Sequence, residues 1–463
     1  MTYAKAIDYL YSLERFGIKL GLENISHILN SLNNPHRKFK AIHIAGTNGK
    51  GSTAAMTASI LQHAGYKTGL YTSPHLQDFR ERIMINGAMI PEEEVMELTE
   101  RIRCKMQDAR CKKQEDQYLQ PATCNLQLTF FEFTTAMAFL YFAEEMVDFA
   151  VVEVGMGGRL DATNVLNPVL SVITEIDIEH TEHLGGDIRT IAIEKGGIIK
   201  EKGTVILSSC KTEAIEAIEA ICKEKHAKMY RIGSDFTAEM EHRNSIGQWF
   251  KFLNLQPSAF SLQPLCIPLL GKYQIANAST AVMAAYILTE KGFITGETAI
   301  RNGLKNVRWN GRLEIVSEKP LIILDGAHNP AAAKALAEEL ERIKNQESRC
   351  KGQDKNSKLI LIIGILKDKD FRGIIDFLSP TANYVIIVRP KSDRSSEPED
   401  LKNEFLKYIK DVEVIEDIPD AVSKAKGIAG RDDIICITGS FFTIGEARGY
   451  IKEMQNSKCK IQN

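Results

Sequence analysis

The sequence predicts an α/β protein of two domains, each a parallel or mixed sheet with helices on its faces. Short apolar runs rich in β-branched residues alternate with helical patterns along the chain, as in sheets whose strands are buried on both faces. A second set of such runs follows Asn306. The length of 463 residues is too great for one ordinary core and favours two or three domains.

Composition excludes several classes of protein. Charged residues make up 25% and hydrophobic residues 44% of the chain, and the formal net charge is −2, so neither a nucleic acid nor a membrane surface is an expected partner. None of the nine cysteines forms a C-x-x-C pair, which argues against disulfides and zinc and favours a cytoplasmic location. The longest apolar run, 136–143, is far shorter than the ~20 residues that span a bilayer.

The first domain is expected to cover residues 1–306. Residues 1–17 resemble an amphipathic helix with Ile7, Leu10 and Tyr11 on one face, and not a signal peptide. A second helix, 52–64, carries apolar residues at helical spacing and is followed by Gly65, which favours its termination. The strands of this domain are predicted at 40–45, 67–72, 149–154, 170–176 and 204–208.

The second, smaller domain is expected to cover residues 307–463 and to be Rossmann-like, with a junction at 307–312. Its strands are predicted at 321–324, 359–365, 384–388 and 433–438. Two polar segments, about 108–122 and 345–357, are interpreted as surface loops or insertions.

Polar, Gly-rich segments follow the predicted strands. Because open parallel sheets bind ligands at the carboxyl ends of their strands, these segments are the candidate functional regions. They are residues 46–50, 72–75, 153–164, 177–185, 325–330 and 438–440.

The sequence IAGTNGKGST, residues 44–53, is similar to a phosphate-binding loop but departs from G-x-x-x-x-G-K-[ST] twice. Ile44 replaces the first Gly, and Gly51 replaces the hydroxyl residue after Lys50 that holds Mg²⁺. Glycines let the backbone approach phosphate oxygens, the following helix adds its positive end, and Lys50 adds a full charge. A turn without a ligand is the alternative, which the strand, lysine and helix in register disfavour.

Four further features have weaker individual signals. Glu153 ends an apolar strand, where a buried carboxylate needs a cation; Mg²⁺ is one candidate and pairing with Arg159 is the alternative. His180 could bind a metal or be structural, and His183 competes for either role.

Lys195 lies in a predicted helix and, taken alone, indicates only a surface lysine beside Glu194. Residues 325–330, with Asp325, His328 and Asn329, could be merely a polar turn.

Taken together and in order, these motifs resemble those of the folylpolyglutamate synthase/dihydrofolate synthase family, within the Mur-type ATP-dependent amide ligases. The resemblance covers most of the chain. It rests on GTNGKGS (46–52), TSPH (72–75), FRERI (79–83), TFFEFTT (129–135), EVGMGGRLDATN (153–164), EHTEHLG (179–185), EKGGIIK (194–200), GKYQIANA (271–278), WNGRLE (309–314), DGAHNP (325–330), LKDKD (366–370) and TGSFFTIGE (438–446).

The resemblance implies roles for individual residues. ATP contacts would come from Gly46, Thr47, Asn48, Gly49, Lys50, Gly51, Ser52, Asn277, Arg312 and Asp325. Mg²⁺ ligands would be Ser73, Glu153 and His180, and Lys195 matches a position often carbamylated to help hold a second Mg²⁺. The pterin would be bound by Ser12, Leu13, Glu14, Arg15, Phe131, Phe133, Leu160, Asp161 and Ala162, and glutamate by His328 and Ser440. Lys50, Lys195, His180 and His328 would take part in catalysis.

Four positions depart from the family pattern. Glu179 stands where Asp is frequent, Gly196 where Ala is frequent, Asn310 where Pro is frequent and Tyr273 where His is frequent. None of these departures removes an expected ligand.

The resemblance implies an ATP-dependent ligase that adds L-glutamate to a folate γ-carboxylate through an acyl phosphate. A second activity on dihydropteroate and K⁺ as a further cofactor are additional expectations. A monomeric state is expected as well. The closest alternative is a cell-wall amino-acid ligase, whose extra nucleotide-sugar domain would need more than the ~45 residues before the loop. A P-loop switch protein is the other alternative, and a second α/β domain with polar strand ends argues against it.

Overall fold

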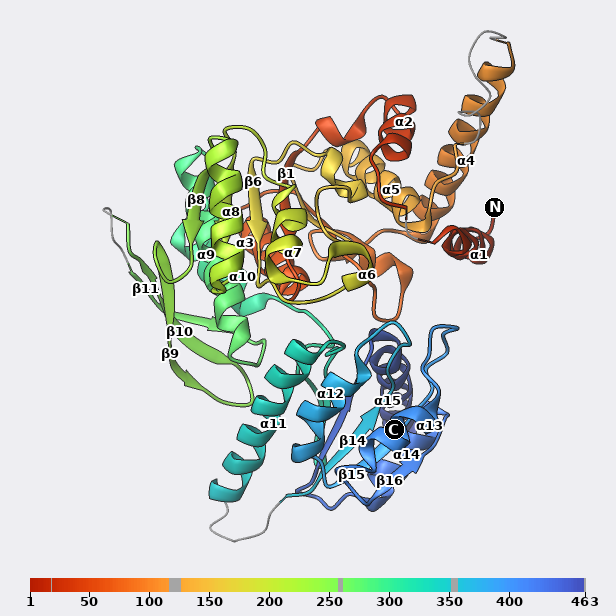
Figure 1. The fold of residues 1–463 in the computed structure, drawn as a ribbon, viewed down its shortest axis with the longest axis vertical. Helices are drawn as coiled ribbons and strands as arrows, with labels where there is room; N and C mark the ends of the chain where they lie inside the picture. Colours follow the sequence, from red (N-terminus) through yellow and green to blue (C-terminus); the bar gives the residue numbers. More distant parts are fainter. Residues whose placement is uncertain (18, 116–125, 257–260, 351–356, 462–463) are drawn as a thin grey trace. The chain divides into compact units, whose positions relative to one another are not determined.

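The computed structural model describes residues 1–17, 19–115, 126–256, 261–350 and 357–461, which form two compact units (Figure 1). The first unit comprises residues 1–73, 79–268 and 274–307. The second comprises residues 74–78, 269–273 and 308–463. Two short segments that precede residue 307 therefore belong to the second unit.

An eight-stranded mixed sheet organises the first unit. Six neighbouring strands are parallel, and β3 and β4 extend the sheet at one edge in antiparallel fashion. In spatial order the strands are β4 (Ala88–Met89), β3 (Ile83–Ile85), β2 (Thr68–Tyr71), β5 (Phe149–Glu153), β1 (Lys40–Ala45), β6 (Leu170–Ile173), β7 (Thr204–Leu207) and β8 (Lys228–Arg231). The five strands predicted here are confirmed, with some ends shorter by one to three residues. The chain places β2 and β5 on one side of β1 and β6 to β8 on the other, so the loop after β1 lies at the switch point where such sheets bind ligands.

Helices pack against this sheet (Figure 1). Helix α3 packs against β1, β2 and β5, while α5 and the pair α7 and α8 contribute to two hydrophobic clusters with residues of the sheet. The helices of the unit are α1 (Tyr3–Ser12), α2 (Glu23–Ser31), α3 (Lys50–His63), α4 (Glu92–Glu115), α5 (Phe130–Glu144), α6 (Thr181–Leu184), α7 (Ile188–Gly196), α8 (Thr212–Glu224), α9 (Tyr273–Glu290) and α10 (Glu297–Asn306), with 3₁₀ turns at Leu13–Phe16, Pro35–Arg37, Phe79–Arg82 and Ala162–Val165.

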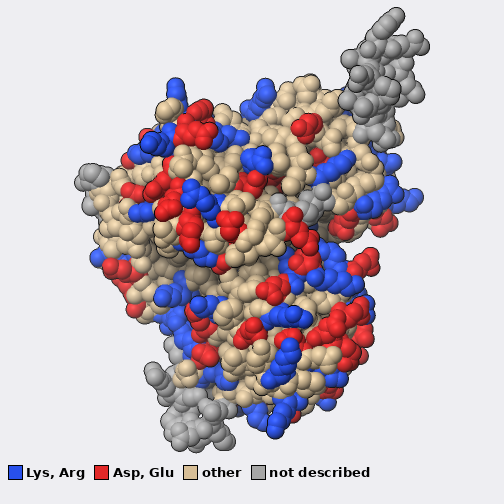
Figure 2. Space-filling model, viewed as in Figure 1, with Lys and Arg blue, Asp and Glu red and all other residues tan. Residues whose placement is uncertain are grey.

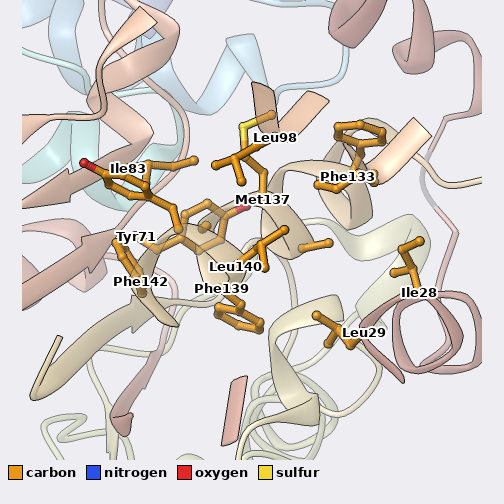
Figure 3. Close-up of a cluster of buried hydrophobic side chains, with 14 of the residues drawn as sticks. Ile28, Leu29, Tyr71, Ile83, Leu98, Phe133, Met137, Phe139, Leu140 and Phe142 are labelled. Carbon is orange, nitrogen blue, oxygen red and sulfur yellow. The ribbon is translucent and has the colours of Figure 1, made fainter. Parts of the chain in front are cut away.

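The larger of these clusters is built around α5. Residues from α2, α4, β2 and β3 converge on the helix, whose side chains are buried along most of its length (Figure 3). A capping box formed by Thr129 and Glu132 fixes where α5 begins, because each side chain binds the backbone N–H of the other. The apolar run at 136–143 is therefore a buried helix of a globular core.

A three-stranded antiparallel sheet was not predicted from the sequence. Its strands are β9 (Phe236–Arg243), β10 (Gln248–Asn254) and β11 (Ser261–Ile267). In β10 every second residue is buried, which is the period-two pattern of a half-buried strand. This alternating pattern differs from the continuous apolar runs that predict the central strands.

Two other local predictions were wrong. Tyr11 is 38% exposed, and Ala6 and Leu10 form the buried face of α1. Residues 108–115 and 345–350 are helical, within α4 and α11, because polar Lys, Glu, Arg and Gln are also good helix formers. The remainder of those two predicted loops lies largely outside the described residues.

The second unit contains a six-stranded sheet in which only β12 is antiparallel to its neighbour. All four strands predicted for this domain are confirmed. In spatial order the sheet contains β12 (Glu314–Glu318), β13 (Leu321–Leu324), β17 (Ile434–Thr438), β14 (Leu359–Ile363), β15 (Tyr384–Ile387) and β16 (Val412–Val414). The helices are α11 (Pro330–Cys350), α12 (Phe371–Leu378), α13 (Pro398–Phe405), α14 (Ile418–Ile428) and α15 (Phe441–Ile461), with a 3₁₀ turn at Ser379–Thr381. The predicted two-domain α/β class is thus confirmed.

The surface carries charges of both signs. Figure 2 shows Lys and Arg interspersed with Asp and Glu over the face in view, in keeping with the net charge of −2. Within the described part of the chain, no helix combines the length and the apolar character needed to cross a membrane.

Candidate active site

The loop between β1 and α3 can form only with glycine at two positions. Gly46 has φ 145° and Gly49 has φ 90°, both in the range that L side chains rarely adopt. A Cβ atom on Gly46 would overlap the side chain of Thr174, and one on Gly49 would overlap that of Asn277. The predicted ATP contact Asn277 therefore lies directly against the loop.

Hydrogen bonds fix the shape of this loop. The backbone N–H groups of Thr47 and Asn48 donate to the carbonyl of Glu175, at 2.8 and 3.3 Å, and so are used to anchor the loop. Lys50 Nζ donates to the carbonyls of Gly46 at 2.8 Å and Thr47 at 3.0 Å. The first four N–H groups of an α-helix have no intrahelical acceptor, so the start of α3 offers donors and a positive end to an anion.

A polar contact from α9 supports the loop. Gln274 donates to the hydroxyl of Ser52 at 3.2 Å and accepts from the amide of Asn277 at 3.0 Å. All three side chains are buried, so each polar group needs its partner. Ser52 and Asn277, both predicted ATP contacts, are thus linked through Gln274.

Ser73 and Glu153 lie together at the ends of neighbouring strands. Glu153 is the last residue of β5 and is 5% exposed, and its Oε2 accepts the backbone N–H of Ser73 at 3.1 Å. Arg159, the alternative partner of Glu153, instead pairs with Glu194 at 2.9 Å. Among the described residues no three His, Cys, Asp or Glu side chains gather as a metal site. A Mg²⁺ ion here would need mixed ligands, such as a carboxylate, a hydroxyl and water, which its preference for oxygen allows.

Lys195 is buried beside the loop, so its interpretation as a surface lysine was wrong. It is 1% exposed, and its Nζ donates to Glu179 Oε1 at 2.6 Å and to the carbonyl of Gly46 at 2.9 Å. Burial lowers the pKa of Lys195 to about 8, although Glu179 opposes the change. Burial alone would raise the pKa of Glu179, but Lys195 and Lys50 outweigh it and lower this pKa to about 2. The carboxylate of Glu179 is therefore ionised at neutral pH.

His180 immediately follows Glu179 in an unusual backbone conformation. Its φ is 47°, in the left-handed region, where it precedes the first residue of α6. Non-glycine residues adopt this region at an energetic cost and often at functional positions. The side chain of the competing His183 lies outside what the structure describes.

In the second unit, four predicted residues gather at the ends of the adjacent parallel strands β13 and β17. The buried carboxylate of Asp325 accepts the N–H groups of Leu313 and Ala327, each at 2.9 Å. The Arg312 guanidinium lies 4.7 Å from the Phe441 ring centroid, and the His328 ring lies 5.6 Å from the same centroid. Ser440 is buried and bonds the hydroxyl of Thr443 at 2.8 Å.

Tyr273, one of the departures from the family pattern, also contacts this cluster. Its hydroxyl hydrogen-bonds Asp325, and burial raises the pKa of both groups. The tyrosine therefore supports Asp325 at a position where histidine is frequent in the family.

The predicted pterin residues divide into a loop and an aromatic group. Asp161 is buried, and its carboxylate accepts the N–H groups of Met156 and Thr163 at 2.9 Å and the hydroxyl of Thr163. Through these bonds the Asp161 side chain stabilises the conformation of its own loop. Phe131 is half-buried against Gly155, whereas Phe133 is fully buried in the core, edge-on to Tyr9.

The N-terminal residues expected near the pterin form the end of α1 and the turn after it. Leu13 is buried, while Ser12, Glu14 and Arg15 are exposed. The N–H of Gly21 donates to the carbonyl of Leu160 at 3.3 Å. This bond brings the segment after the turn next to the predicted pterin loop.

Comparisons with known proteins identify the family of this chain. Residues 44–285 match the Mur ligase middle domain and residues 311–441 match the Mur ligase glutamate ligase domain. The dihydrofolate synthase/folylpolyglutamate synthase of Bacillus subtilis is 34% identical over 97% of this chain and 99% of its own length.

The chain belongs to the folylpolyglutamate synthase/dihydrofolate synthase family.

Solved structures of this family have the same fold. E. coli FolC in complex with DHPP and ADP has a TM-score of 0.83 at 29% identity, covering 98% of this chain and 100% of that one. The bifunctional folylpolyglutamate synthase/dihydrofolate synthase from Yersinia pestis, complexed with AMPPNP and Mn ion, has a TM-score of 0.80 at 27% identity, covering 98% of each chain. The chain is an enzyme of this class of ATP-dependent ligases.

Several residues that shape the candidate site were not predicted from the sequence. Gln274 belongs to the motif GKYQIANA but was not predicted as a site residue, and Thr174 and Glu175 lie within the strand predicted at 170–176, outside every motif. Glu175 acts through its backbone carbonyl, which any residue could supply. No residue-type signal could have identified it.

Proposed function

We propose that this chain adds L-glutamate to the γ-carboxylate of a folate at the expense of ATP, forming folylpolyglutamate. The observation that carries the proposal is the nucleotide loop, which lacks a hydroxyl after Lys50, together with Ser73 and Glu153 at the neighbouring strand ends. Full-length similarity to a synthase of that name supports the choice of substrates.

The chemistry follows from the poor leaving group of a carboxylate. Transfer of the γ-phosphoryl group of ATP to the folate carboxylate gives an acyl phosphate, whose acyl carbon the glutamate amine attacks with release of phosphate. Lys50 and the start of α3 would stabilise the negative charge on the transferring group. Mg²⁺, which Ser73, Glu153 and His180 would hold, supplies further positive charge when bound.

We assign roles to further predicted residues as follows. Asn277, Arg312 and Asp325 contact ATP, and His328 and Ser440 bind the incoming glutamate. Phe131 offers a half-buried ring on which a pterin can stack, and the backbone at 160–162 supplies its polar contacts. Phe133 contributes through the core behind that surface.

Lys195 has the properties needed for carbamylation. Its lowered pKa leaves a fraction of neutral amine, whose nitrogen bonds to the carbon of CO₂ and then loses a proton. The product would place a second anion beside Glu179, so it needs a cation for stability. We therefore expect carbamylation to require Mg²⁺ as well as bicarbonate, with ¹³C-bicarbonate NMR as the measurement.

One assay tests the proposal. Phosphate release from ATP is measured with tetrahydrofolate plus glutamate, with dihydropteroate plus glutamate, and with no acceptor. We expect release with tetrahydrofolate, and release with dihydropteroate as well if the chain has both activities that its B. subtilis relative's name gives. Hydrolysis that is independent of an acceptor would contradict the ligase assignment, and replacing K⁺ by Na⁺ tests the monovalent ion.

We further propose that the enzyme acts as a cytoplasmic monomer. Nine cysteines without C-x-x-C spacing favour a reducing compartment. Size-exclusion chromatography with light scattering would measure the oligomeric state, and a stable dimer would contradict this part of the proposal.

A further inference from the structure

A buried histidine lies behind the loop that contains Leu160, Asp161 and Ala162. His43, in β1, is fully buried, and its Nε2 lies 2.8 Å from the hydroxyl oxygen of Thr163. That hydroxyl donates its one proton to the carboxylate of Asp161. The hydroxyl oxygen must therefore accept a hydrogen bond from His43, which fixes the Nε2–H tautomer of the ring.

The other ring nitrogen of His43 has no such partner. Its Nδ1 is buried without a hydrogen-bond partner. Burial lowers the pKa of His43 to about 3, so the ring is neutral at physiological pH. An unsatisfied buried nitrogen is unfavourable, and an apolar side chain would fill this place in the sheet without that cost. The Nε2–H donor is what distinguishes histidine from such a residue here.

The hydrogen bonds that begin at His43 connect the backbone on the two sides of residues 160–162. The Asp161 carboxylate accepts the hydroxyl and N–H of Thr163 with one oxygen and the N–H of Met156 with the other. His43, Thr163 and Asp161 thus form a relay from β1 to the backbone on either side of residues 160–162.

A second set of bonds holds the same loop from the other end. Asn164 donates to the carbonyls of Arg159 and Gly197, at 2.9 and 3.1 Å. Lys200 Nζ donates to the backbone carbonyl and to the side-chain oxygen of Asn164, each at 2.9 Å. Because Asn164 anchors one end of the loop independently, loss of the His43 bond should shift residues 160–162 without unfolding the segment.

We propose that His43 is a positioning residue for the folate substrate: through Thr163 and Asp161 it sets the backbone of residues 160–162, against which the pterin binds. This inference rests on the proposed function. The inference gives a role to His43, which lies in the strand before the nucleotide loop. Because His43 is fully buried, this role does not involve direct contact with ATP.

The test compares variants by the KM for each of the three substrates. His43→Leu removes the donor, and we expect the KM for tetrahydrofolate to rise about five- to tenfold, the effect of one lost hydrogen bond, with the KM values for ATP and glutamate unchanged. His43→Gln, whose amide N–H can donate to Thr163, should recover most of the affinity. Ser171→Ala is the matched control, since Ser171 is buried opposite His43 on β6 and its hydroxyl donates to Ile198 instead.

A double variant tests whether His43 acts through Thr163. Because His43 acts through the Thr163 hydroxyl, His43→Leu combined with Thr163→Val should raise the folate KM no further than Thr163→Val alone, although the loss of the bond to Asp161 lowers the melting temperature of both variants. An unchanged folate KM in either variant, or an equal rise in the KM for ATP, would overturn the inference. Failure of the proposed function is distinguishable, because the wild-type enzyme would then release no phosphate in response to a folate.

Discussion

At the residue scale, Lys195 and Glu179 form a buried ion pair beside the nucleotide loop. The side chains are 1% and 10% exposed, and Nζ and Oε1 are 2.6 Å apart. Breaking such a pair leaves an uncompensated charge in a site of low dielectric constant. The motif around Lys195 pointed to a functional lysine, but only the fold shows that its partner is the glutamate found where aspartate is frequent.

This pair predicts a pH dependence of stability. The pKa of Glu179 is about 2 in the folded chain against 4.5 ordinarily, so its contribution is complete above pH 4.5 and is lost as the pH falls towards 2. Between pH 5 and pH 3, without Mg²⁺ and bicarbonate, the free energy of unfolding of the wild type should fall by about 2 kcal/mol more than that of Glu179→Gln.

Urea unfolding at several pH values would measure the difference. Glu194→Gln is the control, because Glu194 pairs with the exposed Arg159 and such surface pairs contribute little. Parallel pH profiles for wild type and Glu179→Gln would contradict the assignment of the lowered pKa to Glu179.

Glu153 offers a second prediction at this scale. Glu153→Gln keeps the size of the side chain and an oxygen that can accept the N–H of Ser73, but loses the charge that would hold Mg²⁺. We expect Glu153→Gln and Glu153→Ala to lower kcat by at least about a hundredfold if the carboxylate holds the catalytic ion. Phosphate release measures turnover, and circular dichroism checks the fold. Near-normal turnover of Glu153→Gln would exclude this carboxylate as an essential ligand.

At the scale of elements, the turn from β1 to α3 is the part of the site that the sequence specified best. The turn needs glycines because of their φ angles and because Thr174 and Asn277 leave no room for a Cβ atom. Its glycine spacing, lysine and following helix are local features. They could therefore be recognised without knowledge of the rest of the fold.

Two glycines on either side of α3 allow a matched test of this turn. Gly49 and Gly65 flank the helix with φ 90° and φ 92°, but only at Gly49 would a Cβ overlap a neighbour. Replacement by Ala should destabilise the chain by roughly 1–2 kcal/mol at Gly65 because of the left-handed backbone, and by more at Gly49, where the Cβ atom would also overlap Asn277. ATP should raise the melting temperature of wild type and Gly65→Ala, but not of Gly49→Ala.

Differential scanning fluorimetry with and without Mg-ATP would measure both effects. Equal ATP-induced shifts in the two variants would show that the loop does not depend on Gly49 for binding.

Other elements were less predictable. Continuous apolar runs identified the central strands, since strands buried on both faces have no polar positions. The antiparallel strands β9 to β11 have one exposed face, so polar residues interrupt their apolar pattern and no continuous apolar run marks them. The polar end of α4 was predicted as a loop because of its composition. Periodicity, more than polarity, would have distinguished these cases.

At the scale of the whole molecule, each unit has its own hydrophobic cores. Ile173 of β6 and Leu361 of β14 are both fully buried, in separate clusters of the first and second unit. We expect scanning calorimetry to resolve two unfolding transitions, because each core can lose its packing independently.

Core substitutions would assign the two transitions. Leu361→Ala and Ile173→Ala should each destabilise one transition by about 2–5 kcal/mol, the usual result of a cavity in a core. A single transition that both variants shift equally would mean that the units unfold together.

The sequence by itself determined the α/β class and the family and predicted the candidate ligands, because glycine turns, apolar runs and ordered motifs are local in the chain. Only the tertiary structure showed that Lys195 is buried against Glu179, that Phe133 belongs to the core, and that His43 hydrogen-bonds Thr163. The first and the last of these relations join residues that are 16 and 120 positions apart. Burial and hydrogen-bond partners depend on packing between distant segments, and a motif does not record them.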